Sequence, residues 1–279
     1  MVNDRIAVVT GASAGIGEAI ARSLSAGGAR VVLNARRADR LEALARDLEP
    51  GGGAAAGGAS GARTAVVAGD AADEGVIGRM LDAARDRLGG GTREADLVVV
   101  NAGRGLRGSV YDSDVSQWEE VFRINLVAAA RLMRAAAERM AGPVPVVRGA
   151  PPSSPAPPAD WLDRPRDIVV LGSTVGRHLS PFSSLYGSAK AGVHMLAESL
   201  RRLMAPRGVR VTLIEPGIVR SEFQSVANYD PESFGKFMDS IGPVLAPADI
   251  ARLVLFVVSQ PAGVHVNDVM IRPTRQEYP

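Results

Sequence analysis

Residues 5–17, RIAVVTGASAGIG, decide the fold of this 279-residue chain. A short apolar run ends at Thr10, a glycine-rich turn follows, and the next segment, EAIARSLSAGG, has helical apolar spacing. Gly11 permits a tight turn, while Gly15 and Gly17 let the backbone approach an anion to which free helix N–H groups point. The spacing differs from the G-x-G-x-x-G fingerprint. The segment still predicts a strand, a phosphate-binding turn and a helix.

The remaining sequence alternates short apolar runs with segments of helical spacing, which is typical of a parallel sheet covered on both faces. We therefore expect one doubly wound, Rossmann-like α/β domain of about seven strands, spanning residues 1–279. The longest helices are expected at residues 115–140 and 184–205. The strands are expected at about residues 5–10, 30–35, 64–69, 95–101, 167–173, 209–215 and 268–272.

Two segments break this alternation. Residues 50–62, PGGGAAAGGASGA, are of low complexity and predict a flexible loop before the third strand. Residues 141–166 hold eight prolines and interrupt the link to the fifth strand. They are interpreted as a surface insertion on the sheet edge away from the strand carboxyl ends, or as an interaction arm anchored by Trp161.

A tyrosine and a lysine stand four residues apart in the segment LYGSAKAG, as Tyr186 and Lys190. Lys190 is one of only two lysines among the 32 basic side chains, so arginine is used nearly everywhere else. On a helix this spacing places both side chains on one face. An ammonium group beside the phenol lowers the tyrosine pKa from its usual value of roughly 10. Such a tyrosine can act as a general acid/base at an alcohol oxygen, although an exposed surface pair has the same spacing.

Together the glycine-rich turn and this pair resemble the short-chain dehydrogenase/reductase family over nearly the whole chain. The family motif T-G-x-x-x-G-x-G is matched from Thr10 to Gly17. By resemblance Tyr186 and Lys190 are catalytic. The catalytic serine maps onto Ser173, at the end of DIVVLGS, and the catalytic asparagine onto Asn125, in VFRINLVAAARL.

Two further family segments are present. The N-A-G segment is Asn101–Gly103, although Val100 replaces the asparagine that commonly precedes it. The proline-glycine turn after the sixth strand is Pro216-Gly217. The resemblance implies a substrate lid at about 218–243, whose candidate walls are Phe223, Phe234, Phe237 and Met238. Helix packing alone would also explain those four apolar residues.

The second strand indicates which nicotinamide cofactor is used. Enzymes that select NAD place a carboxylate at the end of this strand, toward the ribose 2′-hydroxyl. Here Ala35 holds that place and Arg36 and Arg37 follow, which favours the 2′-phosphate of NADP; the two arginines would also suit a solvated helix start. The resemblance implies cofactor contacts from Gly11, Ser13, Gly15, Ile16, Gly17, Arg36, Arg37, Asp70, Ala71, Asn101, Ala102, Gly103, Tyr186, Lys190, Pro216, Gly217, Val219 and Ser221.

The implied function is an NADP(H)-dependent oxidoreductase that transfers a hydride between the nicotinamide and a carbonyl, secondary alcohol or aldehyde substrate. The alternative is a catalytically silent binding scaffold or regulator, against which the complete catalytic set argues. The tail DVMIRPTRQEY resembles a branch containing 3-hydroxy acid dehydrogenases and clavulanate-type aldehyde reductases. Arg272 or Arg275 would then attract an acidic or polar substrate, whereas the lid phenylalanines suggest a bulky apolar ketone.

Composition limits the remaining possibilities. The chain has no cysteine, which excludes disulfides and thiolate metal sites, and its three scattered histidines predict no metal site. A net charge of +2 with mixed signs along the chain predicts no nucleic-acid surface, and no apolar run is long enough to span a membrane. A cytoplasmic protein is expected. The resemblance implies a homotetramer, or a dimer, built through the helices at 115–140 and 184–205, and small and apolar residues on more than one face of these helices agree with it.

Overall fold

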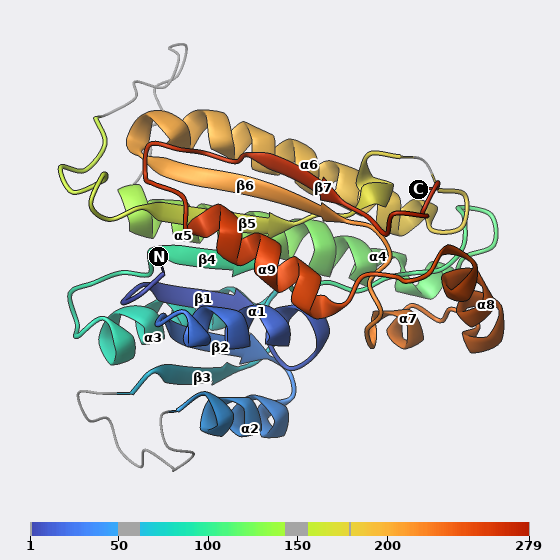
Figure 1. Ribbon diagram of the computed structural model, residues 1–279, viewed down its shortest axis with the longest axis horizontal. Helices are drawn as coiled ribbons and strands as arrows, with labels where there is room; N and C mark the ends of the chain where they lie inside the picture. Colours follow the sequence, from blue (N-terminus) through green and yellow to red (C-terminus); the bar gives the residue numbers. More distant parts are fainter. Residues whose placement is uncertain (1, 50–61, 143–155, 179, 279) are drawn as a thin grey trace.

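The computed structural model describes residues 2–49, 62–142, 156–178 and 180–278 and contains a seven-stranded parallel sheet (Figure 1). The expected doubly wound, Rossmann-like α/β fold is confirmed, and the strand bounds differ from the predicted ones by no more than two residues. The strands are β1 (Ile6–Thr10), β2 (Arg30–Ala35), β3 (Thr64–Ala68), β4 (Leu97–Val100), β5 (Arg166–Leu171), β6 (Val209–Pro216) and β7 (Asp268–Ile271).

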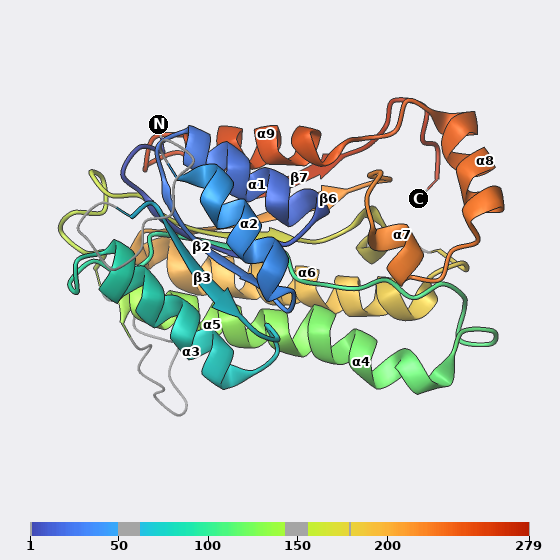
Figure 2. The same cartoon turned by 90° about the horizontal axis from the view of Figure 1, so that it is seen from below.

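Helices cover both faces of the sheet (Figure 2), with α1, α2 and α9 on one side and α3, α5 and α6 on the other. The α-helices of the described residues are α1 (Gly15–Ala26), α2 (Ala38–Leu48), α3 (Glu74–Ala83), α4 (Trp118–Phe122), α5 (Ala128–Ala141), α6 (Ser184–Met204), α7 (Phe223–Val226), α8 (Pro231–Ile241) and α9 (Pro247–Val258). The short elements are η1 (Ala84–Leu88), η2 (Val115–Gln117), η3 (Arg123–Val127), η4 (Thr174–Gly176) and η5 (Ala205–Arg207).

Alternate residues of each strand enter opposite cores. Ile6 and Val8 of β1 pack into the core shared with α3, α5 and α6, whereas Ala7 and Val9 pack into the core shared with α1, α2 and α9. All four side chains are fully buried. Burial on both faces explains why the strands read as continuous apolar runs rather than as alternating ones.

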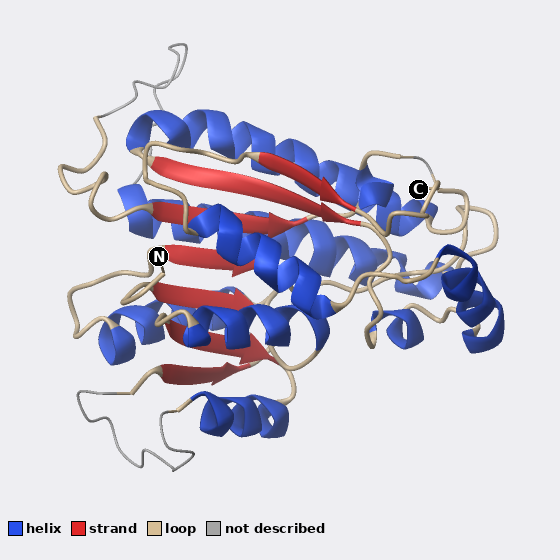
Figure 3. Cartoon of the chain, viewed as in Figure 1, coloured by secondary structure: helices blue, strands red, loops and turns tan. Residues whose placement is uncertain are grey.

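The strand order is β3-β2-β1-β4-β5-β6-β7, so the direction of winding reverses between β1 and β4. In open parallel sheets this switch point opens a crevice at the carboxyl ends of the strands. The strands end on the side where α7 and α8 project beyond the sheet (Figures 1 and 3). The topology therefore places any small-molecule site between the strand ends and these two helices.

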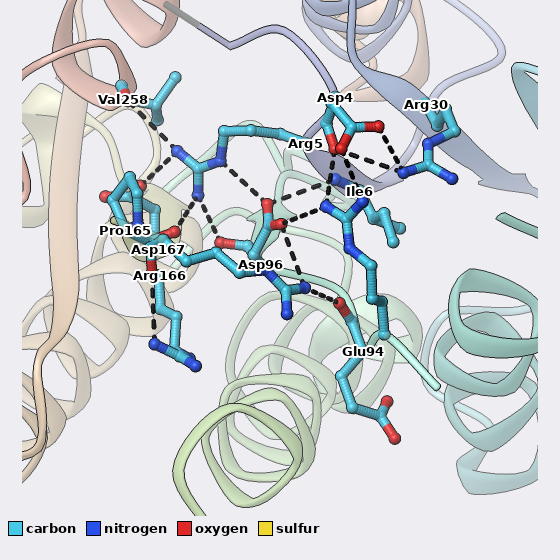
Figure 4. A network of polar contacts seen from close by, with 12 residues as sticks. Asp4, Arg5, Ile6, Arg30, Glu94, Asp96, Pro165, Arg166, Asp167 and Val258 are labelled. Atoms are coloured by element: carbon cyan, nitrogen blue, oxygen red, sulfur yellow. Dashed lines mark hydrogen bonds and ion pairs between the residues drawn. The ribbon is translucent and has the colours of Figure 1, made fainter. Parts of the chain in front are cut away.

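A buried ionic network lies at the opposite, amino-terminal ends of the central strands (Figure 4). Arg5 donates from Nε to Asp96 Oδ1 at 2.9 Å and from Nη1 to Asp167 Oδ2 at 2.7 Å. Arg210 donates from Nε to Asp167 Oδ1 at 2.7 Å. All four of these residues are buried. Removal of one partner from such a buried pair costs about 3–5 kcal/mol, because the other charge is left uncompensated; the network thus ties four strands at the end remote from the crevice.

The two irregular segments lie largely outside the described residues. Of the expected low-complexity loop at 50–62 only the last residue is described. Of the proline-rich segment at 141–166 the structure describes both ends. Trp161 there is half-buried, and its Cβ lies 3.1 Å from where a side-chain Cβ would stand at Gly208. Trp161 therefore packs against its own domain. No described helix combines the length and apolar character required to cross a bilayer.

Candidate active site

A cavity of about 800 Å³ lies at the carboxyl ends of the strands, at the switch point. Its lining includes every residue that the sequence assigned to catalysis or cofactor binding. The glycine-rich turn, the end of β2, the turn after β4, the start of α6 and the turn after β6 all contribute. These residues are Gly11, Ser13, Gly15, Ile16, Gly17, Arg36, Arg37, Asp70, Ala71, Asn101, Ala102, Gly103, Asn125, Ser173, Tyr186, Lys190, Pro216, Gly217, Val219 and Ser221.

The glycine-rich turn leaves helix N–H groups facing this cavity. Ala14, at the N-cap of α1, supplies no side-chain hydrogen bond, and Glu18 N–H donates to the Ala14 carbonyl at the start of the helix. The N–H groups before Glu18 have no intrahelical acceptor. Gly15 has a φ of 57°, which other residues rarely adopt, and a Cβ there would stand 3.3 Å from Ser221 Cβ. The turn therefore fits a close-approaching anionic group.

Thr10 and Asn101 join the turns that follow β1 and β4. Thr10 Oγ1 accepts the N–H groups of Asn101 and Ala102, both at 3.0 Å, and donates to the Val99 carbonyl at 3.2 Å. The Asn101 amide in turn donates from Nδ2 to the Thr10 carbonyl at 2.8 Å. These reciprocal bonds fix the turn after β1 relative to the turn after β4, and the two turns border the switch-point crevice.

Tyr186, Ser173 and Lys190 meet on the inner side of the cavity. Tyr186 and Lys190 lie one turn apart on α6, and Ser173 follows β5, where it forms the N-cap of η4. The Ser173 side chain is close enough to the Tyr186 phenol to lower its pKa. Lys190 Nζ donates to the Leu171 carbonyl at 2.6 Å and lies 5.8 Å from the centroid of the tyrosine ring.

The titration of this group differs from the sequence-based expectation. Tyr186 remains half-exposed to the cavity, but the protein surrounds its phenol, and this burial raises the tyrosine pKa above its ordinary value of 10.0. The Ser173 side chain acts in the opposite direction, but its effect is smaller. The expectation that Lys190 lowers the pKa of Tyr186 was wrong for this structure. The Lys190 ammonium is directed to the Leu171 carbonyl instead. Burial also lowers the pKa of Lys190 to about 8.

Asn125 lies in the π-helical turn η3, within the long helical run that the sequence predicted at 115–140. Its Nδ2 donates to the carbonyls of Val121 at 2.9 Å and Arg104 at 2.8 Å. Its Oδ1 accepts the Arg104 N–H at 3.3 Å, and a Cβ at Gly103 would stand only 2.6 Å from that oxygen. A π-turn shifts the register of a helix and is frequent at functional sites. Here it turns the Asn125 amide toward the loop that follows β4.

The two arginines after β2 line the cavity beside the glycine-rich turn. Arg37 donates to Ser13 Oγ from Nη2 at 3.1 Å, and its Nη1 lies 2.9 Å from Glu222 Oε2. Asp70, at the next strand end, accepts the Ala72 N–H at 2.9 Å and pairs with Arg123 at 2.6 Å. The end of β2 thus carries an alanine at position 35, where an acidic residue would select NAD, and two guanidinium groups follow it.

The segment at 218–243 contributes an aromatic wall. Phe223, Phe234 and Phe237 line the cavity as expected, whereas Met238 does not. The Phe223 ring centroid lies 5.4 Å from that of Tyr186, and Tyr229 and Phe234 are 4.6 Å apart. On α8 the cavity-facing side is formed by Ser233, Phe234 and Phe237, and Met238 lies beyond the edge of that face.

The C-terminal tail reaches the same cavity, but not through the arginines that were expected there. Gln276 and Tyr278 line the cavity, and neither Arg272 nor Arg275 does. Gln276 Oε1 accepts the Ile218 N–H at 2.9 Å. Arg275 instead donates to the Gly242 carbonyl at 3.2 Å. Sequence reasoning missed Gln276, since a glutamine in an irregular tail carries no periodic signal.

Sequence reasoning also missed His194. Its Nε2 accepts the Ser173 N–H at 3.2 Å. One signal was available: His194 follows Lys190 by four residues and Tyr186 by eight, which is the repeat of one helix face. Arg104 and Arg107, in the loop after β4, also line the cavity without having been singled out.

Known proteins place this fold and site in one family. A model of the family "short chain dehydrogenase" matches residues 5–145 and 163–232, and its gap falls within the proline-rich segment. An uncharacterized oxidoreductase of Staphylococcus aureus (strain MW2) is 30% identical over 274 residues, covering 98% of this chain and 99% of the relative. A relative in Staphylococcus epidermidis (strain ATCC 12228 / FDA PCI 1200), also an uncharacterized oxidoreductase, is 30% identical over 272 residues and 98% of both chains.

Solved structures agree with this assignment. The closed form of serine dehydrogenase in complex with NADP+ is 26% identical, with a TM-score of 0.75 over 98% of this chain and 96% of that chain. A serine dehydrogenase from Escherichia coli is 25% identical, with a TM-score of 0.71 over 98% of this chain and 99% of that chain. The chain belongs to the short-chain dehydrogenase/reductase family, and is thus an oxidoreductase of the dehydrogenase/reductase type.

Proposed function

We propose that this protein is an NADP(H)-dependent oxidoreductase that interconverts a carbonyl group and an alcohol. The observation that carries the proposal is that Tyr186 and Ser173 share one cavity with the glycine-rich turn and with Lys190. A group that can move a proton thereby lies within the same enclosure as a cradle for a pyrophosphate.

The nicotinamide, when bound, supplies or accepts a hydride at the carbon of the reacting group. Tyr186 gives its phenolic proton to the carbonyl oxygen in the reducing direction. The raised pKa of Tyr186 keeps it protonated before the reaction, which suits an acid. Ser173 Oγ hydrogen-bonds the same oxygen and stabilises the negative charge that develops there. Lys190 would hold the ribose hydroxyls of the bound cofactor, and Asn125 would position a water through which the proton is replaced.

The preference for NADP over NAD rests on the end of β2. Ala35 leaves no carboxylate to repel a 2′-phosphate, and Arg36 and Arg37 stand beside it in the cavity lining. A serine dehydrogenase with NADP+ and an alcohol dehydrogenase with 5-hydroxy-NADP are among the similar structures, but so is a 3-ketoacyl-(acyl-carrier-protein) reductase with NADH. The residues of this chain therefore carry the proposal for NADP.

The substrate is an aldehyde or ketone with an apolar body. The aromatic wall of Phe223, Phe234 and Phe237 beside Tyr186 supports this class. A small hydroxy acid is the second candidate, because Arg104 and Arg107 line the same cavity and could hold a carboxylate. We further propose that residues 218–243 form the substrate lid, that the enzyme is a cytoplasmic homotetramer, and that the segment at 141–166 is a surface insertion.

The experiment is a panel of aliphatic, aromatic and carboxylate-bearing carbonyls and alcohols, with NADPH oxidation or NADP reduction followed by absorbance. Turnover of at least one carbonyl that depends on Tyr186 is expected. Activity confined to carboxylate-bearing substrates would favour a small hydroxy acid as the substrate instead of an apolar aldehyde or ketone. Tight NADPH binding without turnover on any member of the panel would instead favour the silent scaffold.

A further inference from the structure

The imidazole of His194 occupies a slot formed by two glycines on either side of Ser173. A Cβ at Gly172 would stand 2.3 Å from His194 Nε2, and one at Gly176 would stand 2.5 Å from His194 Cε1. Separations below 3.0 Å do not occur for real Cβ atoms, so neither position accepts a side chain while the ring is in place. The absence of both Cβ atoms lets the ring from α6 pack directly on the backbone of the turn between β5 and η4.

Within this slot the ring is bonded to the backbone of Ser173. Ser173 N–H donates to His194 Nε2 at 3.2 Å, so this nitrogen carries a lone pair and the ring proton stands on Nδ1. His194 Nδ1 lies 3.9 Å from Glu215 Oε2, and the histidine side chain is 10% exposed. The second nitrogen thus faces a carboxylate beyond direct hydrogen-bond distance, and this negative charge favours a proton on Nδ1.

The other end of the same turn is also tied down. Arg177, which follows η4, donates from Nε to Glu215 Oε2 at 3.0 Å, and its Nη2 lies 2.5 Å from Asp268 Oδ2. Glu215, in β6, is fully buried. The turn that carries Ser173 is therefore held from α6 by His194 and from β6 and β7 by the pairs of Arg177.

We propose that His194 is a positioning residue, which acts through the backbone of Ser173 to set the place of the Ser173 hydroxyl beside Tyr186. This inference rests on the proposed carbonyl reduction, because it assigns His194 a part in that reaction. His194 does not itself touch the reacting atoms. It holds the amide of Ser173, and the Ser173 side chain lies close enough to the tyrosine phenol to affect its pKa.

The surrounding charges are consistent with a neutral ring. Burial lowers the pKa of His194 to about 4, and the nearby positive charges of Lys190 and Arg177 act in the same direction, while Asp268 opposes them. Burial also raises the pKa of Glu215, against the effect of Arg177. A protonated ring would present an N–H to the Ser173 N–H, two donors face to face, so the bond requires the neutral ring.

The kinetic test compares two substitutions of His194 on the holoenzyme. His194→Leu removes the acceptor, whereas His194→Gln retains an oxygen at the same distance along the side chain as Nε2. We expect His194→Leu to lower kcat roughly tenfold with an unchanged KM for NADPH, and His194→Gln to restore most of the rate. In an enzyme that already carries Ser173→Ala, adding His194→Leu should lower kcat by less than about twofold, because the effect of His194 passes through the Ser173 hydroxyl.

Additive losses in the double variant, or equal losses for leucine and glutamine, would overturn the proposal. A measurement on the wild type covers the case in which His194→Leu does not fold. With ¹⁵N-labelled histidine, we expect His194 at pH 7 to show a protonated Nδ1 and an unprotonated Nε2; a protonated Nε2 would refute the bond. If no carbonyl is reduced, the proposed function fails, whereas the tautomer and the hydrogen-exchange rate of the Ser173 amide in the two variants still decide whether His194 holds Ser173.

Discussion

Arg37 Nη1 lies 2.9 Å from Glu222 Oε2, although 185 residues separate the two in the sequence. Arg40 pairs with the other oxygen of the same carboxylate at 2.7 Å. The pair joins the end of β2 to the segment that enters α7, at the rim of the cavity. The guanidinium proposed to bind the 2′-phosphate is thus already paired with a carboxylate of the proposed lid, and a phosphate would have to displace or share that carboxylate.

The first prediction concerns the choice of cofactor. Replacing Arg36 and Arg37 together by alanine should raise the KM for NADPH roughly 10- to 100-fold and change that for NADH little, since hydrogen bonds to charged groups contribute about 1.5–3 kcal/mol. Steady-state kinetics with both cofactors measure this. Arg22→Ala, which removes an exposed guanidinium elsewhere on the surface, is the matched control.

Glu222 gives this prediction an independent check. Glu222→Gln removes the competing carboxylate but keeps the size of the side chain, and should lower the KM for NADPH by a few fold, as expected for an exposed pair worth about 0.2–1 kcal/mol. Equal use of NADPH and NADH by the wild type would contradict the assignment of the arginines, whatever Glu222→Gln does.

The second prediction concerns proton transfer. Tyr186→Phe should abolish turnover while NADPH binding stays nearly unchanged, because only the hydroxyl that moves the proton is lost. Ser173→Ala should cost roughly a hundredfold or more in kcat, as for the loss of one donor to a developing oxyanion. Rates and NADPH fluorescence titrations measure the two effects separately. A Tyr186→Phe enzyme with more than a tenth of the wild-type rate would remove Tyr186 from its role.

The parts of the site that the sequence predicted are local or lie at strand ends. Tyr186 and Lys190 are one helical turn apart, so their proximity follows from helix geometry alone. Ser173 and Asn101 follow buried strands, and in a parallel sheet such positions meet at one edge. The apolar runs likewise determined the strand bounds to within two residues, since both faces of the sheet are buried.

What the sequence did not predict depends on irregular backbone or on burial. Glu222 and Gln276 lie in segments without hydrophobic periodicity. Their partners, Arg37 and Ile218, are distant in the sequence. The raised pKa of Tyr186 depends on how completely the protein encloses the phenol, which spacing does not report. The expected effect of Lys190 on that pKa failed because the ammonium found a backbone carbonyl as its partner.

The third prediction concerns stability at acid pH. The pKa of His194 falls from 6.5 to about 4 on folding, so between these values the unfolded state binds more protons. The contribution of His194 to stability should therefore be constant above about pH 7 and be lost as pH falls from 6.5 to 4, by an amount on the order of 3 kcal/mol. Urea denaturation across this range should show a shallower loss for His194→Gln than for the wild type.

A matched control for this comparison is His178→Gln, at an exposed position outside the sheet. It should follow the wild-type curve. Parallel pH profiles for the wild type and His194→Gln would show that His194 does not titrate in this way, and would also weigh against the neutral ring that the bond to Ser173 requires.

The fourth prediction concerns assembly. Met195 and Leu196 of α6 are 72% and 38% exposed, and Val127 of the adjoining η3 is 42% exposed. Phe256 of α9 is 55% exposed on another face. Two separate apolar surfaces suit two kinds of symmetric contact, as in a tetramer. Light scattering should give about four times the 29.1 kDa mass of the chain. Met195→Glu should shift this toward smaller species, and a wild-type mass near that of one chain would eliminate the prediction.

The last prediction concerns the C-terminal tail. Gln276 is buried, its Oε1 accepts the Ile218 N–H at 2.9 Å, and a Cβ at Gly217 would stand 2.4 Å from that oxygen. The tail thus holds the backbone of the turn after β6, which lines the cavity and is proposed to contact the cofactor. Loss of this contact should loosen the turn for every substrate, rather than for acidic ones alone.

Deleting residues 273–279, or replacing Gln276 by leucine, should therefore raise the KM for NADPH about three- to tenfold, in keeping with one lost hydrogen bond worth about 1 kcal/mol. The increase should be the same with apolar and with carboxylate-bearing substrates. Arg275→Ala, whose side chain is exposed and bonds only to the Gly242 carbonyl among the contacts described, is the control and should leave both constants near those of the wild type. A KM increase confined to carboxylate-bearing substrates, and reproduced by Arg275→Ala, would show instead that the tail binds an acidic substrate through its arginines.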